Sequence, residues 1–325
     1  MSAFAREVQT VICDRKGEQK KTVEMFVQTE GRRRYYTSHR RRVRVNLTAP
    51  KQAALNDRLA WEYLEALIEM NFGAGDYYLT LTYKHLPADV EEAKRDYDRF
   101  SERARKLYKS FGIKFEAVMI MSQSYRRGEL VRLHLHVIMR GGVPRELIEA
   151  LWRKADKAGR CKPGEEYKRL GAKLGRANCA LLEPDGNGLA ALCAYLAKQP
   201  RDGIARRWYA TVGLKKPYIT SRNDEKYSIK DIKEIAERNA DIPDTAWWER
   251  EYPGWTLYDD RTFAYTCRES EFSGISIRVK LRKLTEAEVE ERRKEKEKRQ
   301  KLKEQVIGHG NARGGTRTRV CARKE

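Results

Sequence analysis

The run from Leu133 to Met139 constrains the fold more than any other segment, because histidine and aliphatic residues alternate along it. Side chains two positions apart on a β-strand point to the same face. His134 and His136 are therefore predicted to share one face, while Leu135 and Val137 face a core. Two imidazoles at this spacing can bind one divalent metal ion. The alternative is a pair of polar side chains on a solvated sheet face.

The surrounding pattern predicts a mixed α+β fold. β-rich runs and amphipathic helical runs follow one another in the order strand, helix, strand, strand, helix, strand, helix, which favours a largely antiparallel sheet flanked by helices. The expected strands are 77–83, 114–123, the histidine run and 178–183, and the expected helices are 50–72, 89–110, 144–157 and 188–199.

Composition shifts divide the chain into four predicted parts. Residues 1–47 comprise a β-hairpin and an arginine-rich segment, and 48–227 contain the α+β core. Residues 228–283 form a smaller appended region. In 284–325 a capping box, Thr285 to Glu288, opens a charged helix that leads into a basic, glycine-rich tail predicted to be disordered.

The charge balance indicates a polyanionic partner. The 325 residues include 68 Lys and Arg against 47 Asp and Glu, a net charge of +21, which suits nucleic acid and, as the competing possibility, an anionic membrane surface. The sequence contains neither a long apolar run nor a signal-peptide pattern, so we expect a protein outside the membrane. Six scattered cysteines without a CxxC pair favour a reducing cytoplasm.

A metal held by the two histidines needs further ligands. The preceding strand ends near them, and Gln123 is the first choice for a third ligand, with Glu129 in the following turn as the alternative. Ser122 lies beside Gln123 and is expected on the other face. Two imidazoles and one oxygen would leave positions open for water or a phosphate oxygen, as in catalytic metal sites.

A second motif is Tyr195-Leu196-Ala197-Lys198 on the helix predicted at 188–199. Residues at i and i+3 lie on one helix face, so the phenol of Tyr195 and the amine of Lys198 are neighbours. A phenol beside a cation or metal can act as a nucleophile toward phosphorus. The alternative is a half-buried tyrosine on an ordinary amphipathic helix.

In combination these motifs resemble the HUH endonucleases, and most closely the rolling-circle replication initiators of bacterial plasmids, integrated elements and filamentous-type phages. The resemblance rests on the β-rich run Leu79 to Tyr83, the His-Leu-His run and the Tyr195 motif, in this order in a basic chain. Similarities outside these motifs extend it over about residues 45–283. The sequence departs from the family pattern where Ser122-Gln123-Ser124 replaces the usual acidic third ligand, and in having a single tyrosine at the motif.

The resemblance implies an RRM-like sheet and cleavage of single-stranded or nicked origin DNA. His134, His136 and Gln123 would bind Mg²⁺ or Mn²⁺, Tyr195 would become linked to a 5′ phosphate, and Lys198 would position the metal or offset phosphate charge. The freed 3′ hydroxyl would prime a host polymerase. The chain lacks a GxxxxGK[ST] loop, so a separate helicase is expected. The readings that stay open are an HUH transposase or relaxase and a non-catalytic nucleic-acid-binding protein.

Candidate DNA contacts complete the expectations. Thr80 and Thr82 alternate outward on the first strand, although β propensity alone would explain them. The remaining candidates are basic: Arg132, Arg222, Arg40, Arg41 and Arg42, the last three in the arginine-rich segment that also contains Tyr35 and Tyr36.

Overall fold

The computed structural model confirms the α+β class, with antiparallel sheets flanked by helices. It describes residues 3–15, 17–29, 50–155, 170–185, 187–201, 204, 206–259, 261–270, 274–295, 297–298 and 301. The chain divides into two compact units. One comprises Met1–Asp244 and Leu257–Arg282, and the other Thr245–Thr256 and Lys283–Glu325.

A central antiparallel sheet carries the histidine run. Its strands lie in the order β8-β3-β5-β4-β9; the β3–β8 and β3–β5 ladders are continuous, and the β4–β5 ladder shifts register between Ser124 and Tyr125. Two crossover helices, α3 (Val90–Ser110) after β3 and α4 (Arg145–Ala150) after β5, return the chain to the sheet. The strands are β3 (Tyr77–Thr82), β4 (Ala117–Arg126), β5 (Glu129–Met139), β8 (Ala177–Leu181) and β9 (Tyr209–Ala210).

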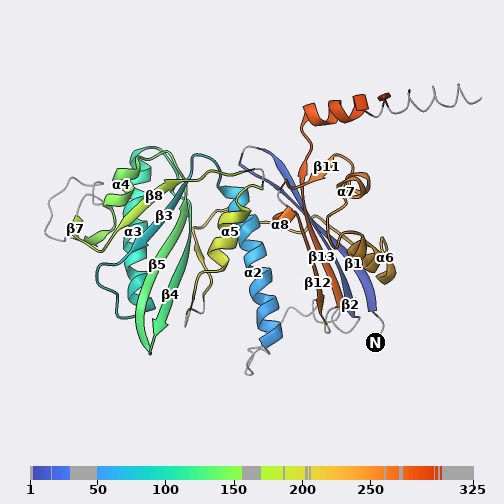
Figure 1. Cartoon of the computed structure of the whole chain (residues 1–325). Coiled ribbons are helices and arrows are strands. Elements are labelled where there is room, and N and C mark those ends of the chain that lie inside the picture. The colour runs from blue at the N-terminus through green and yellow to red at the C-terminus, as the bar shows by residue number, and fades with distance from the viewer. Residues whose placement is uncertain are drawn as a thin grey trace, which may run out of the picture. The chain divides into compact units, whose positions relative to one another are not determined.

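The two faces of this sheet are covered by different helices (Figure 1). Leu79, Leu135 and Val137 are fully buried on the face that α3 and α4 cover. On the other face, apolar residues pack against α2 (Pro50–Asn71) and α5 (Ala190–Ala197). The histidines project toward this second face, which is the face on which α2 and α5 pack.

Helix α4 is shorter than the prediction of 144–157. It ends at Ala150 because Trp152, which follows, is 1% exposed and donates from Nε1 to the carbonyl oxygen of Thr82 at 2.7 Å. The chain then continues as β6 (Arg153–Ala155), which pairs with β7 (Leu170–Lys173). An aromatic side chain that must be buried against β3 thus overrides helical propensity.

A second antiparallel sheet joins segments from both ends of the chain. The predicted N-terminal hairpin is present as β1 (Ala3–Cys13) and β2 (Gln19–Thr29). Strand β2 also pairs with β13 (Gly274–Lys283), with Met25 opposite Ile277. The hairpin and the 228–283 region, predicted as separate parts, therefore share one sheet. Among its other strands, β10 (Ser221–Asn223) pairs with β1 and β12 (Tyr265–Ser270) pairs with β13, and helices α6 (Ile229–Arg238) and α8 (Arg261–Ala264) lie in the connections.

Helix α2 contacts both sheets. Leu64 and Ile68 pack on the second face of the central sheet. Its carboxylates face the other sheet, where Glu65 pairs with Lys280 and the Oε1 atom of Glu69 lies 3.3 Å from the Nζ atom of Lys20. Glu69 Oε1 also accepts a hydrogen bond from the backbone N–H of Leu189 at 3.2 Å, immediately before α5. Burial raises the pKa of Glu69, and the charge of Lys20 opposes this shift.

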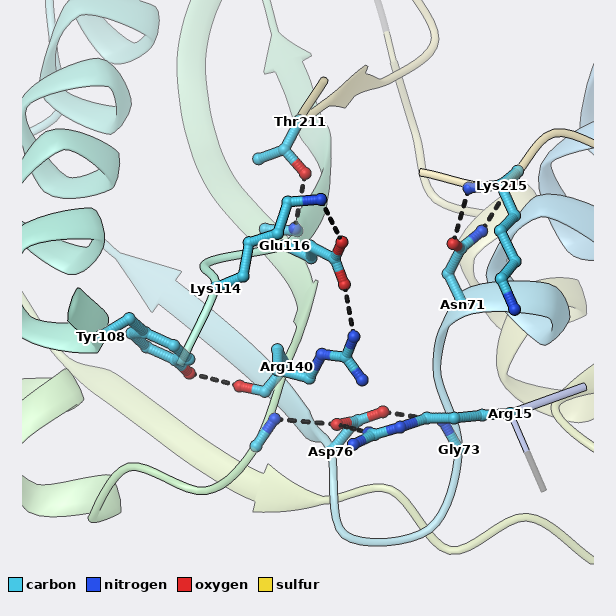
Figure 2. A network of polar contacts seen from close by, with 12 residues as sticks. Arg15, Asn71, Gly73, Asp76, Tyr108, Lys114, Glu116, Arg140, Thr211 and Lys215 are labelled. Carbon is cyan, nitrogen blue, oxygen red and sulfur yellow. Dashed lines mark hydrogen bonds and ion pairs between the residues drawn. The ribbon is translucent and has the colours of Figure 1, made fainter. Parts of the chain in front are cut away.

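A polar network fastens one end of the central sheet (Figure 2). Asp76, which has no exposed surface, accepts hydrogen bonds from the N–H groups of Gly73 at 3.0 Å and Gly141 at 2.8 Å and pairs with Arg15. Gly141 is required there, because a Cβ atom would lie 1.8 Å from the carbonyl oxygen of Gly75. Glu116 pairs with Lys114 at 2.8 Å and Arg140 at 2.6 Å, and both cations lower its pKa although burial opposes them.

The second unit contains α7 (Thr245–Glu251), the first two residues of β11 (Trp255–Leu257) and helical residues 286–295. The predicted capping box is confirmed: Thr285 N–H donates to Glu288 at 2.8 Å, and Glu288 N–H donates to the Thr285 hydroxyl at 3.3 Å. The tail predicted to be disordered from Gly308 lies outside the described residues.

Two further sequence expectations concern cysteines and membranes. Cys179 and Cys193 are buried, Cys13 and Cys267 are exposed, and all four are free thiols. Within the described part of the chain, no helix has the length and apolar character needed to cross a membrane.

Candidate functional site

Both imidazoles lie on the same face of β5, as the alternation predicts. Along the ladder His136 is opposite Thr80 and His134 is opposite Thr82 on β3. The centroids of the two rings are 6.2 Å apart. Leu135, between them, is fully buried on the opposite face. The pair therefore lies on the middle strand of the sheet, and strand pairing on both sides of β5 fixes its position.

His136 is the more buried member, with 3% of its surface exposed. Its Nδ1 atom lies 2.7 Å from the hydroxyl of Tyr78, and the two rings stack with an interplanar angle of 6°. Its Nε2 atom is buried, and among the described residues it has no hydrogen-bond partner of good geometry. Burial and the charges of His134 and Arg132 together lower the pKa of His136 to about 4, although the nearby Gln199 side chain opposes this shift. The ring is therefore neutral at pH 7, the form that can bind a metal.

His134 lies closer to solvent and is covered by an arginine. Arg132, two residues earlier on the same face, donates from Nε to His134 Nε2. The Nδ1 atom of His134 is buried and has no hydrogen-bond partner. Partial burial and the charge of Arg132 lower the pKa of His134. Arg132 thus occupies one ring nitrogen directly beside the pair.

Tyr195 on α5 faces the histidines from the second face of the sheet. Its ring centroid is 6.0 Å from that of His136, with the rings nearly perpendicular, and 49% of the residue is exposed. Cys193 and Leu196, on the same helix as Tyr195, are buried in the core of this face and anchor α5 there. Lys198 is the C-terminal cap residue of α5 and is exposed. The structure thus brings Tyr195 to His136 and leaves Lys198 at the solvent.

Tyr78 is a site residue that the motif reading did not single out. It bridges the two groups, because its hydroxyl contacts His136 and lies close to Tyr195. Burial raises the pKa of Tyr78 to about 12, and Tyr195 adds to this shift. Its phenol is therefore protonated at neutral pH. The sequence did carry a signal for Tyr78. Tyr78, Thr80 and Thr82 are two positions apart and so share one face of β3, which is the same face of the sheet as the β5 histidines.

The prediction that Gln123 is the third metal ligand is wrong in its geometry. Gln123 pairs with Leu133, so its side chain lies on the opposite face of the sheet from the imidazoles. Ser122 is the β4 residue opposite His134, and its hydroxyl donates to the carbonyl oxygen of Pro200 at 3.1 Å. Glu129, the alternative, begins β5 at the tip of the hairpin opposite Arg126. The observed register of β4 differs by one residue from the predicted one, so Ser122 takes the place on the histidine face that was predicted for Gln123.

The donor set fits a divalent metal in part. Two neutral imidazoles on one face present buried nitrogens without partners, as metal-binding histidines do. Among the described residues, no group of three or more His, Cys, Asp or Glu side chains is arranged to bind a metal. His134 and His136 would therefore supply two protein ligands, and oxygen atoms of water or substrate the others.

The remaining predicted contacts fall at different places. Thr80 and Thr82 lie beside the histidines on β3, and Thr82 Oγ1 also contacts the backbone of Arg176. Arg132 lies at the pair itself. Arg222 is exposed on the edge strand β10 of the second sheet, and Arg40, Arg41 and Arg42 lie outside the described residues.

No family model, curated protein or solved structure matches this chain.

Proposed function

We propose that this chain is a metal-dependent HUH-type endonuclease that nicks and rejoins single-stranded origin DNA and initiates rolling-circle replication. The observation that carries the proposal is one constellation: two neutral imidazoles with bare nitrogens, and an exposed phenol 6.0 Å from one of them. The two imidazoles share one face of β5, and the phenol reaches the same face from helix α5.

The arrangement of the central sheet supports the proposal. The chain runs strand, helix, two strands, helix, strand, with the sheet order β8-β3-β5-β4 and both crossover helices on one face, and this connectivity is the one expected for the proposed RRM-like sheet. The other face, where such sheets bind nucleic acid, is the one that carries the histidines.

In the proposed reaction, Tyr195 Oη attacks the scissile phosphorus. The new Oη–P bond forms as the P–O3′ bond breaks; the phenol loses its proton and the released 3′ oxygen takes one up to become a primer hydroxyl, so no net proton is gained or lost. His134 and His136 would hold a divalent metal, which would supply Lewis-acid polarisation of the phosphate. Tyr78 fixes the His136 ring: when Nδ1–H donates to the Tyr78 oxygen, Nε2 retains its lone pair for the metal. Attack by the 3′ hydroxyl on the phosphotyrosine reverses the step and rejoins the strand.

The test is the covalent product. The full chain is incubated with Mn²⁺ and a random single-stranded DNA library labelled at its 3′ end, since this end stays with the 5′-phosphotyrosine. We expect a labelled adduct that survives denaturing electrophoresis and is lost in Tyr195→Phe. Tyr125→Phe is the matched control, because Tyr125 is 45% exposed and Tyr195 49%. An adduct that persists in Tyr195→Phe would contradict the assignment.

The alternatives give different outcomes of the same experiment. Sequencing of the captured strands distinguishes a replication origin from the element ends that an HUH transposase or the transfer origin that a relaxase would cut. A non-catalytic nucleic-acid-binding protein would give salt-sensitive binding, no adduct and no change in Tyr195→Phe.

A further inference from the structure

An aromatic and arginine cluster lies next to the proposed site and takes no part in the chemistry above. Tyr63 and Trp208 stack with centroids 6.4 Å apart at an interplanar angle of 19°, and Trp61 lies 6.3 Å from Trp208. The guanidinium of Arg201 lies 4.7 Å from the Trp61 ring centroid. We define this aromatic–arginine cluster by its members: Asp57, Trp61, Tyr63, Arg201, Arg207 and Trp208.

Asp57 is the centre of the cluster. It accepts hydrogen bonds from Trp61 Nε1 at 3.2 Å, from Arg207 Nε at 2.6 Å and from Arg201 at 3.2 Å. Burial opposes ionisation of Asp57, but the hydrogen bonds from Arg207 and Arg201 lower its pKa overall. The carboxylate thus holds both guanidinium groups in place, with that of Arg201 over the indole of Trp61, so the cations are pre-positioned.

The cluster is joined to the histidine pair through the chain that leaves α5. Gln123 N–H and the Ser122 hydroxyl both donate to the carbonyl oxygen of Pro200, at 2.9 and 3.1 Å. Ser122 is the β4 residue opposite His134, and Arg201 follows Pro200 directly. A DNA strand with its phosphate at the histidines therefore has Arg201 and then Trp61 as neighbours on this side.

Packing alone does not account for the composition of the cluster. Apolar contacts would be enough to fasten the segment near Trp208 to α2, but here two arginines share one aspartate, which leaves a positive charge. Arg206 adds another cation, 4.4 Å from the ring centroid of Tyr209. Tyr63 remains 39% exposed beside these charges. Exposed aromatic faces among cations are the composition of surfaces that stack single-stranded bases.

We propose that the aromatic–arginine cluster stacks unpaired bases next to the scissile phosphate, with Tyr63 as the exposed stacking face and Arg201 and Arg207 as phosphate contacts. The inference rests on the proposed function and adds a binding surface for the unpaired bases of its single-stranded substrate. A paired strand keeps its bases inside the duplex and gains little from this surface.

The test measures binding without cleavage. Fluorescence anisotropy follows a fluorescein-labelled oligothymidylate added to the full chain in EDTA, and Tyr63→Ala is expected to raise the Kd by about fivefold to a hundredfold. Leu59→Ala is the matched control, since Leu59 lies on the same helix and is 44% exposed. Tyr63→Trp is expected to retain the affinity. An abasic strand of equal length and a duplex are expected to bind more weakly to the wild-type chain and to be insensitive to Tyr63→Ala.

Equal Kd values for Tyr63→Ala and Leu59→Ala, or equal affinity for the abasic and the base-bearing strand, would overturn the proposal. The adduct assay separates this failure from failure of the proposed function. An adduct with no effect of Tyr63 on the Kd leaves the nuclease and removes the stacking surface. A clear effect of Tyr63 with no adduct from any strand keeps the surface and removes the nuclease.

Discussion

The two ends of the central sheet treat buried polar atoms in opposite ways. At the Asp76 end, carboxylates are matched by backbone N–H groups and cations, as Figure 2 shows. Toward the other end of β5, His136 Nε2 and His134 Nδ1 are buried without partners. An unsatisfied buried polar atom costs about 1–3 kcal/mol. This contrast between the two ends is what the proposed metal site explains, because a bound metal would occupy the unpaired imidazole nitrogens.

The first prediction concerns the unsatisfied end and carries the largest effect. His136→Ala is expected to reduce adduct formation with Mn²⁺ by more than about a hundredfold, because it removes a ligand of the proposed metal site. Its thermal unfolding is expected to change less than that of Asp76→Asn. His85→Ala, an exposed histidine just after β3, is the control and is expected to form the adduct at the wild-type rate. Equal losses of adduct formation in His136→Ala and His85→Ala would show that the loss is not specific to the histidine pair.

At the Asp76 end, a substitution is expected to lower the stability of the fold more than it lowers adduct formation. Asp76→Asn leaves Arg15 and one N–H group without a full acceptor, so the free energy of unfolding is expected to fall by about 3 kcal/mol. Urea unfolding measures the change. Lys114→Ala, which removes an exposed partner of Glu116, is expected to cost less than about 1 kcal/mol. A neutral Asp76→Asn variant would show that this network does not fasten the sheet.

The pH dependence of stability distinguishes the ends again. His136 is neutral in the folded chain down to about pH 4, whereas an unfolded histidine binds a proton near pH 6.5. The unfolded state therefore binds more protons between these values, and stability falls as the pH is lowered, by up to roughly 3 kcal/mol for this ring. The Glu116 contribution, whose pKa is lowered, is lost only below its ordinary value of 4.5.

Urea unfolding of the wild-type chain and His136→Gln at pH 7.0 and 4.5 provides the measurement. The difference between the two proteins isolates the ring, which is needed because the raised pKa of Glu69 has the opposite sign in the same range. An unchanged pH slope in His136→Gln would show that the ring is not held neutral by burial.

The smallest predicted effect concerns Tyr78. Tyr78→Phe keeps the ring stacking and removes the hydroxyl that orients His136, so Mn²⁺ affinity is expected to fall by about tenfold to a hundredfold. Electron paramagnetic resonance titration of free Mn²⁺ measures it without turnover. Tyr77→Phe is the matched control, because the Tyr77 hydroxyl donates to Val143 on the same strand's opposite face. Equal Mn²⁺ affinity in both variants would reduce Tyr78 to packing.

Local alternation predicted much of this site and failed where register decides. The same-face histidines, the buried Leu135 and the hairpin follow from period-two patterns within one strand. Gln123 was placed wrongly because the facing residue depends on which residue of β4 lies opposite His134, and strand pairing fixes this only in the fold. Tyr78 and the pairing of β2 with β13 were missed for the same reason: both join residues distant in the sequence.

The pairing of β2 with β13 has a consequence for biosynthesis. Strand β5 with His134 and His136 and helix α5 with Tyr195 leave the ribosome before Gly274–Lys283, and their mutual contacts are closer in sequence than that of Met25 with Ile277. Contacts between segments near in sequence form first, so the central sheet is expected to fold during synthesis while one edge of the hairpin waits unpaired. A chain that stops before β13 would leave that edge open as a template for association with other strands.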